Sequence, residues 1–267
     1  MEKILSAQNS RIKNLQKVFI KSKERKKQNL FVIEGARELS LALEGAYSLD
    51  SVFICPELFS KTAYRDIQAK IPSSILFEVS LQAYEKIAYR EDSEGILAAV
   101  KSKSLTLNDL CLSGNPFIIV IESVEKPGNL GAILRTADAA KVDAVIVNDT
   151  LADVYNPNVI RSSVGCVFTV PLAIASPSDT FSFLKENRIQ IFAAELQASQ
   201  WYQDTDFTQA CALIMGTEAV GLSPFWLEHA DARIKIPMRG KIDSLNVSVS
   251  TAILTFEAMR QRGFMTN

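Results

Sequence analysis

The sequence predicts an α/β protein whose second half forms a parallel β-sheet covered by helices on both faces. Short, continuous apolar strands are expected at 117–121 and 144–147, and a segment with helical periodicity, 130–140, lies between them. Strands that are apolar on both faces are typical of parallel sheets, because crossover helices cover both sides. The chain has 267 residues, 48% of them hydrophobic and 22% charged, which is enough to bury a core in one large or two small domains.

The first hundred residues predict a smaller α/β unit. Ile12, Leu15, Val18 and Phe19 recur at helical spacing, so we expect a helix over 10–28. The other elements expected in this part are strands at 30–34, 51–55, 75–79 and 96–100, and helices at 36–45 and 81–88.

A linker separates the two parts. Residues 101–116 are polar and end in a Ser-Gly-Asn-Pro sequence, which is typical of a turn or loop. We therefore expect an N-terminal domain at 1–104, a linker at 105–116 and a C-terminal domain at 117–267.

Strands and helices continue to alternate through the C-terminal part. Besides the three segments named first, the elements expected here are helices at 158–163, 180–186 and 246–262, strands at 189–193 and 212–215, and extended segments at 167–171 and 234–236. Ligands of open parallel sheets bind beyond the carboxyl ends of the strands. The loops after Ile121, Met215 and Ile236 are rich in Gly, Pro, Ser or Asn, so we expect the chemistry there.

Several classes of protein are excluded by what the sequence lacks. It has no apolar run of the roughly 18 residues that a membrane helix requires, and no apolar signal core near its start. It has no Gly-x-Gly-x-x-Gly fingerprint and no P-loop. We expect no metal site, because His229 is the single histidine, and we interpret it as an ordinary surface residue.

The four cysteines are far apart, and none belongs to a Cys-x-x-Cys motif. They are Cys55, Cys111, Cys166 and Cys211. Their apolar surroundings predict buried free thiols in a reducing compartment, which indicates a cytoplasmic protein.

Charge is distributed unevenly along the chain. Residues 1–30 contain nine Lys or Arg and two Glu, a net charge of +7, whereas the whole chain has a net charge of −1. Such asymmetry indicates contact with a polyanion, most simply the phosphates of a nucleic acid. A solvated helix face with a run of lysines would give the same pattern, and charge alone does not decide between the two.

Three segments of the C-terminal part combine loop residues with polar side chains. The first runs from Glu125 to Ala140, where Asn129 is placed to cap a helix and Arg135 lies one turn from Asp138. The second, 215–224, brackets Glu218 between two glycines. The third, 236–250, places Ser244 and Asn246 where a long helix begins. Each segment taken alone is also compatible with a capped helix or a tight connection.

Together, in this order and at these spacings, the three segments resemble the signature motifs of the SpoU (TrmH) family, RNA ribose 2′-O-methyltransferases of the SPOUT superfamily. Segments 6–13 and 31–38 resemble the substrate-binding domain of that family, a small α/β unit similar to some ribosomal proteins. The resemblance implies a deep C-terminal trefoil knot, the cofactor S-adenosyl-L-methionine bound in it, and a homodimer. It also implies an RNA substrate, with ribosomal RNA preferred and transfer RNA as the alternative.

The resemblance also implies roles for individual residues. The matching catalytic positions are Arg135, Asn129, Glu218, Ser244 and Asn246, and those at the cofactor are Gly216, Thr217, Ile236, Met238 and Leu245. The RNA contacts expected in the N-terminal domain are Arg11, Lys13, Lys23, Arg25, Lys26, Lys27 and Arg37. Thr217 departs from the Asn that is common at its position, but it removes no proposed chemical group.

Two alternatives of other classes stay open at this point. A non-catalytic RNA-binding or ribosome-assembly protein on the same fold would bind RNA without methyl transfer. An α/β enzyme that uses another nucleotide, such as a dehydrogenase, is disfavoured by the missing glycine fingerprint, and a cofactor titration would decide. The sequence does not say which nucleotide is modified, nor whether the role is housekeeping or antibiotic resistance.

Overall fold

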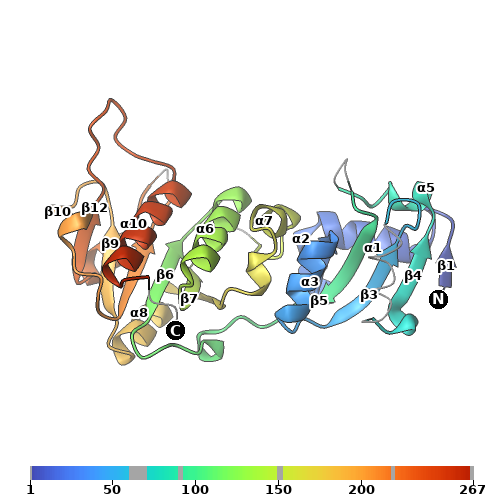
Figure 1. Ribbon diagram of the computed structural model, residues 1–267, viewed down its shortest axis with the longest axis horizontal. Coiled ribbons are helices and arrows are strands. Elements are labelled where there is room, and N and C mark those ends of the chain that lie inside the picture. The colour runs from blue at the N-terminus through green and yellow to red at the C-terminus, as the bar shows by residue number, and fades with distance from the viewer. Residues whose placement is uncertain (1, 60–70, 90–92, 149–152, 218–219, 265–267) are drawn as a thin grey trace. The chain divides into compact units, whose positions relative to one another are not determined.

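The computed structural model describes residues 2–59, 71–89, 93–148, 153–217 and 220–264. The chain forms two compact units, coloured along the chain in Figure 1. Unit 1 contains residues 1–103 and 155–169, and unit 2 contains residues 104–154 and 170–267. Segment 155–169 therefore packs with the N-terminal unit, although sequence order placed it in the C-terminal domain.

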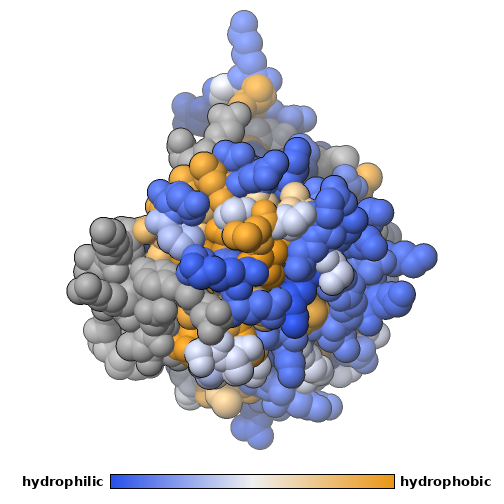
Figure 2. All heavy atoms as spheres, turned by 90° about the vertical axis from the view of Figure 1, so that its right-hand side faces the viewer, coloured by the Kyte–Doolittle hydropathy of each residue, from blue (hydrophilic) through white to orange (hydrophobic). Residues whose placement is uncertain are grey.

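Unit 1 is built on a mixed five-stranded sheet. Its strands, in spatial order, are β1 (Glu2–Ile4), β4 (Leu76–Val79), β3 (Leu49–Ile54), β5 (Ile96–Lys101) and β2 (Leu30–Glu34). β1, β4 and β3 are parallel, whereas β5 runs antiparallel to both of its neighbours. Its described helices include α3 (Ala36–Glu44) and α5 (Leu81–Tyr84). The face of this unit in Figure 2 is mostly hydrophilic around a smaller apolar area.

The basic N-terminal helix is broken into two helices. α1 (Ser10–Ile20) ends before Lys21, whose backbone is extended, and α2 (Ser22–Gln28) follows. The prediction of one helix over 10–28 was therefore wrong. Arg25 explains how the break is tolerated, because its buried guanidinium donates to the carbonyls of Val18 (2.9 Å) and Phe19 (2.7 Å). These are carbonyls that the end of a helix leaves without backbone donors.

Segment 155–169 is held in unit 1 by buried aromatic rings. It contains α7 (Pro157–Ser162) and the 3₁₀ turn η3 (Cys166–Phe168), so the extended conformation predicted for 167–171 was wrong at its start. The rings of Phe31 and Tyr155 stack with centroids 4.3 Å apart, and Phe168 lies 5.7 Å from Phe31. The backbone approaches closely as well, since a Cβ at Gly45 would lie 2.1 Å from the carbonyl oxygen of Phe168.

Unit 2 contains seven described strands, and every pairing between them is parallel, which confirms the predicted fold class. In spatial order they are β10 (Gln200–Trp201), β12 (Ala232–Lys235), β9 (Gln190–Ala194), β11 (Cys211–Met215), β6 (Phe117–Glu122), β7 (Ala144–Asn148) and β8 (Leu172–Ala175). The trefoil knot stays a prediction.

Helices cover both faces of this sheet. On one face, Ile118 and Val120 belong to a core that includes Leu184 of α8 (Pro177–Glu186) and Trp226 of α9 (Pro224–His229). On the other, α6 (Pro127–Ala140) and α10 (Val247–Gln261) pack side by side (Figure 1). Residues of strand β6 on both faces are therefore buried, as the continuous apolar run predicted.

The segment expected to be a linker packs onto unit 2. It contains the 3₁₀ turn η2 (Leu107–Asp109), and Leu107, Leu110 and Leu112 contact the core of the seven-stranded sheet. The N–H of Ile174 in the edge strand β8 donates to the carbonyl of Leu105. Within the described ranges, no helix has the length and apolar character to cross a membrane.

Arg262 fixes the end of the last helix to the amino-terminal ends of the central strands. Its guanidinium donates to the carbonyls of Phe207 (2.8 Å), Asn115 (2.8 Å) and Gln209, and lies over the ring of Phe117 with its carbon 5.4 Å from the centroid. One side chain therefore satisfies carbonyls from two separate loops. Removing it leaves several acceptors without their charged donor.

We predict that Arg262→Ala lowers the free energy of unfolding by about 2–4 kcal/mol, because hydrogen bonds to charged groups contribute more than neutral ones. Chemical denaturation followed by circular dichroism measures it. The control is Arg260→Ala, which removes an exposed guanidinium that contacts Glu257 on the same helix and which we expect to change little. Equal stability of the two variants would contradict the role given to Arg262.

Candidate cofactor and methyl-transfer site

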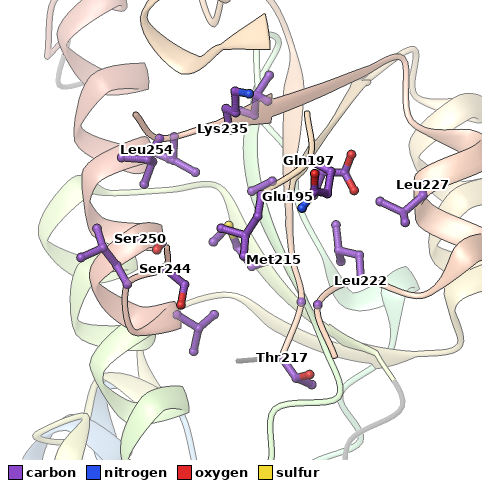
Figure 3. Close-up of a pocket in the computed structure, with 18 of the residues that line it drawn as sticks. Glu195, Gln197, Met215, Thr217, Leu222, Leu227, Lys235, Ser244, Ser250 and Leu254 are labelled. Atoms are coloured by element: carbon purple, nitrogen blue, oxygen red, sulfur yellow. The ribbon is translucent and has the colours of Figure 1, made fainter. Parts of the chain in front are cut away.

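A cavity of unit 2 lies at the carboxyl ends of β9, β11 and β12. It has a volume of about 380 Å³. Figure 3 shows its apolar walls, including Met215, Leu222 and Leu254, together with polar side chains such as Ser244 and Thr217. Parallel strands bring their carboxyl ends to one edge, so segments far apart in the sequence meet here.

The cavity collects most of the predicted cofactor residues. The lining includes Gly216, Thr217, Ile236 and Leu245 from that set, together with Ser244, which was predicted to be catalytic. Met238 is half-buried and is not one of the lining residues. Glu218, predicted to be catalytic, lies outside the described residues.

The loop after β11 is closed by its own hydrogen bonds. Thr217 and Gly221 exchange backbone bonds of 3.1 and 3.0 Å, and the Thr217 hydroxyl accepts from the N–H of Val220. A Cβ at Gly216 would lie 2.3 Å from the carbonyl carbon of Gly221, so only glycine lets the two sides of the loop approach. The result is a compact wall of the cavity.

A buried carboxylate anchors this wall to the neighbouring strand. Glu122, the last residue of β6, accepts from the N–H of Ser223 (2.8 Å) and from its hydroxyl (2.7 Å), one bond on each carboxylate oxygen. The sequence analysis missed Glu122. The sequence feature that could have identified it is an acidic residue at the end of an otherwise apolar strand, at the edge of the sheet where the site was expected.

The first and third motifs meet through two asparagines. The amide of Asn246 donates to Oδ1 of Asn129 across 3.2 Å. Asn246 also caps α10, because its own Oδ1 accepts from the N–H of Ser248. The predicted capping role of Asn129 was wrong: α6 begins at Pro127, so Asn129 lies inside the first turn, where its side chain is available to Asn246.

Arg135 lies further along α6 and is exposed. Among the described residues no ion pair joins it to Asp138, the neighbour one turn away. The local-ion-pair interpretation therefore receives no support. Arg135 is not one of the cavity-lining residues, and its guanidinium is open to an external anion.

One buried acceptor in the cavity has no hydrogen-bond donor in the described structure. It is Oε1 of Glu195, which follows β9 and lines the cavity beside Gln197 (Figure 3). Arg233 lies 3.4 Å from this oxygen and balances its charge. A buried acceptor without a donor fits a ligand that brings a hydroxyl or an amino group. Glu195 is a second residue that the sequence analysis missed.

The cysteines and the histidine are not among the residues that line this cavity. Burial raises the pKa of Cys211 to about 11, so its thiol stays protonated at neutral pH. Cys111 is exposed and Cys166 half-buried, so the prediction that all four cysteines are buried was wrong for these two. His229 is exposed, stacks on Phe225 and lies with Nδ1 2.8 Å from that residue's carbonyl oxygen. No cluster of three metal-ligating side chains occurs within the described ranges.

The RNA contacts predicted in unit 1 have different exposures. The exposed ones are Arg11, Lys13, Lys23, Lys26, Lys27 and Arg37. Arg25 is the exception, because it is buried and satisfies the end of α1. We leave Arg25 out of the proposed RNA surface for this reason.

Comparison with known proteins decides the family. Residues 116–256 match the SpoU rRNA methylase family, and residues 9–98 match the MRM3-like substrate-binding domain. The chain belongs to the SpoU rRNA methylase family. This confirms the resemblance seen in the three motifs.

Among the relatives of this SpoU protein, one matches nearly its whole length and others match about two thirds of it. The 23S rRNA (guanosine(2553)-2′-O)-methyltransferase RlmP of Bacillus subtilis is 31% identical over 96% of this chain and 98% of its own. The 23S rRNA (guanosine-2′-O-)-methyltransferase RlmB of Escherichia coli is 39% identical over 63% of this chain and 72% of its own.

Solved structures agree with this assignment. A crystal structure of an RNA 2′-O ribose methyltransferase has a TM-score of 0.84 and 37% identity, covering 97% of this chain and 99% of that one. An AdoMet-bound rRNA methyltransferase from Sinorhizobium meliloti has a TM-score of 0.87 and 26% identity, covering 97% of both chains. S-adenosylmethionine is the cofactor of this SpoU protein, as predicted.

We predict that Glu122→Gln weakens S-adenosylmethionine binding about 10-fold, because the substituted amide cannot accept both bonds from Ser223 and the cavity wall loses its anchor. Isothermal titration calorimetry measures the affinity, and a melting curve establishes that the variant is folded. Ser223→Ala removes one of the two donors and should have a smaller effect in the same direction. Glu228→Gln, an exposed acid of α9, is the control. Wild-type affinity in Glu122→Gln would show that the anchor does not shape the cavity.

Proposed function

We propose that this chain methylates the 2′-hydroxyl of a guanosine ribose in 23S ribosomal RNA. The observation that carries the proposal is the Asn129–Asn246 pair next to a cavity built from the ends of β11 and β12 and the start of α10, since the chain neighbours of Asn246, Leu245 and Val247, both line that cavity. The relatives named above support guanosine in 23S rRNA as the target. A tRNA substrate stays the alternative, and the proposal places the enzyme in the cytoplasm with its ribosomal substrate.

The cavity suits S-adenosylmethionine, whose sulfonium supplies an electrophilic methyl group. Its volume of about 380 Å³ is that of a small-molecule site. The backbone of Gly216, Ile236 and Leu245 is available for hydrogen bonds, and the Glu195 carboxylate for a hydroxyl or an amino group. Leu222 and Leu254 supply apolar contact area.

The remaining residues act on the ribose. Its hydroxyl must be aligned with the methyl group and must lose its proton as it attacks, so orientation and charge stabilisation are both required. We assign the charge stabilisation to Arg135, which binds the phosphate beside the target ribose and assists proton loss through it. Arginine is always protonated, which excludes a role as a simple base. Ser244 and Asn246 orient the hydroxyl.

A homodimer formed through α10 belongs to the same proposal. Val249 and Phe256 lie two turns apart on α10 and are 46% and 41% exposed. Apolar side chains exposed at this spacing form one strip of a helix face that a second copy can cover.

We expect labelled methyl from S-adenosylmethionine to appear in 23S rRNA and, after nuclease digestion, in 2′-O-methylguanosine. Arg135→Ala should lower kcat about 100-fold or more, with unchanged cofactor affinity, because a charge contact made in the transition state is lost. Arg188→Ala, which removes an exposed arginine elsewhere in unit 2, is the control. Label in a base would overturn the ribose chemistry. Transfer RNA as the labelled fraction would overturn the ribosomal target, and RNA binding without any label would favour the non-catalytic alternative.

The basic helix pair should contribute salt-dependent RNA affinity. The triple variant Lys23→Ala, Lys26→Ala, Lys27→Ala should bind RNA more weakly and reduce the slope of log K against log salt by about 2, because each lost phosphate contact removes about 0.7–0.9. Arg25 is kept, so that α1 stays capped. Replacement of Lys185, Arg188 and Arg260 in unit 2 makes the same charge change as a control. An unchanged slope would indicate that the lysines form only a solvated face.

A further inference from the structure

A second surface of unit 1 has the composition of a nucleotide-binding site. Every described aromatic side chain of unit 1 is buried except Tyr89, which is 51% exposed. Tyr89 borders a shallow depression whose walls also include Phe19 of α1, Glu34 of β2 and Arg161 of α7. These residues come from four parts of the sequence, and none was proposed from the motifs.

The exposed ring of Tyr89 is held in place. One side packs on Phe19, with centroids 5.8 Å apart, and the hydroxyl donates to Oδ1 of Asn158 across 3.3 Å. The backbone N–H donates to the Glu34 carboxylate at 3.3 Å. The ring is thus restrained by packing, by its hydroxyl and by its backbone, while about half of the residue is exposed to water. Such a ring offers a flat surface on which a base can stack, and little further side-chain entropy is lost on binding.

A free cation lies beside this ring. Arg161 is exposed, and no hydrogen bond or ion pair of its guanidinium occurs within the described ranges. It lies one turn from Asn158, so the residue that fixes the tyrosine and the free guanidinium share one face of α7. Arginine suits phosphate, because its planar group can donate two bonds to one anion.

The depression is too small to enclose a base. Its closed space of about 10 Å³ holds at most a single water molecule. A base would therefore lie over the outer face of Tyr89 rather than inside a pocket. This geometry suits an unstacked base of single-stranded RNA, and a continuous duplex offers no free base face to the ring.

Helix α7 lies in the chain between two strands of the catalytic sheet. The segment that contains α7 belongs to the connection between β7 and β8 of unit 2, yet it is fixed in unit 1 by the stacked rings of Phe31 and Tyr155. A nucleotide held at Arg161 is thus bound by a loop of the catalytic sheet itself. The exposed lysines of α1 continue the positive charge beyond Phe19.

We propose that Tyr89 and Arg161 form a contact site for one unpaired nucleotide of the substrate RNA, in which the base stacks on the Tyr89 ring and its phosphate binds Arg161. The inference rests on the proposed function and adds a substrate contact outside the cofactor cavity. Stacking contributes affinity that is insensitive to salt, whereas the phosphate contact contributes a salt-sensitive part.

The test measures binding of the full-length protein to a fluorescein-labelled 12-nucleotide single-stranded RNA by fluorescence anisotropy over a range of salt concentrations. Tyr89→Ala should weaken binding about 10-fold with an unchanged salt slope, and Tyr89→Phe should bind nearly as well as wild type, because the stacking ring remains. Arg161→Ala should weaken binding and reduce the slope by about 0.7, whereas Arg161→Lys should keep the slope. Ile20→Ala, which removes another exposed apolar side chain of unit 1, is the matched control.

Methyl transfer to 23S rRNA separates this inference from the proposed function. The site predicts a raised KM for RNA in Tyr89→Ala and Arg161→Ala, with unchanged affinity for S-adenosylmethionine. Wild-type RNA affinity in both variants would overturn the site while leaving the proposed function intact. A change of oligomeric state in these variants, measured by light scattering, would overturn it in favour of a protein interface. A wild-type protein without methyl transfer would contradict the proposed function, whatever the variants do.

Discussion

The parallel direction of all seven strands in unit 2 is the constraint on which the site depends. It brings the ends of β6, β11 and β12 to one edge, although more than a hundred residues separate the first of them from the last. At that edge the Glu122 carboxylate holds Ser223, and Asn246 holds Asn129. Each of these hydrogen bonds joins two segments that lie far apart in the sequence. The arrangement of this edge therefore follows from the sheet topology, and two polar pairs hold its loops in place.

Burial makes the bonds between Glu122 and Ser223 specific. Glu122 is only 4% exposed, and a buried carboxylate is costly unless strong donors satisfy it. Ser223 supplies two such donors, one to each carboxylate oxygen. A shift of the loop that carries Ser223 would leave the Glu122 carboxylate without these donors. The pair therefore specifies where the loop lies, in addition to any stability that it contributes. Glu195 is satisfied differently: its Oε1 accepts no hydrogen bond within the described residues, and the Arg233 guanidinium 3.4 Å away balances its charge.

The sequence predicted those parts of the fold that depend on local pattern. The apolar runs of β6 and β7 identified buried parallel strands, and the second and third motifs identified part of the cavity lining. The segment 194–197, which also lines the cavity, lies in no motif. It did not predict the break at Lys21, because the periodicity of Ile12, Leu15, Val18 and Phe19 ends before that residue and the lysine-rich continuation is compatible with helix. The break is stabilised by Arg25, whose burial no local pattern indicates.

Contacts between distant residues were equally invisible in the sequence. Asn129 was interpreted as a cap because Asn favours that position, yet Pro127 begins the helix two residues earlier, and Oδ1 of Asn129 accepts from the distant Asn246. Segment 155–169 is a larger example of a contact that sequence order does not reveal. Its order in the chain assigns it to the catalytic domain, but Tyr155 and Phe168 find their apolar partners in Phe31 and Tyr47.

Two stretches of chain, rather than one, join the two units. A domain joined to the methyltransferase only by residues 104–116 would raise the local concentration of RNA and nothing more. Here a second connection runs from β7 through α7 and back to β8, and its middle is built into the core of unit 1. Strand β7, which precedes this segment in the chain, is hydrogen-bonded to β6, and β6 carries the Glu122 carboxylate that holds Ser223. The strand that leads into the core of unit 1 is therefore a direct neighbour of the strand that anchors the cavity wall.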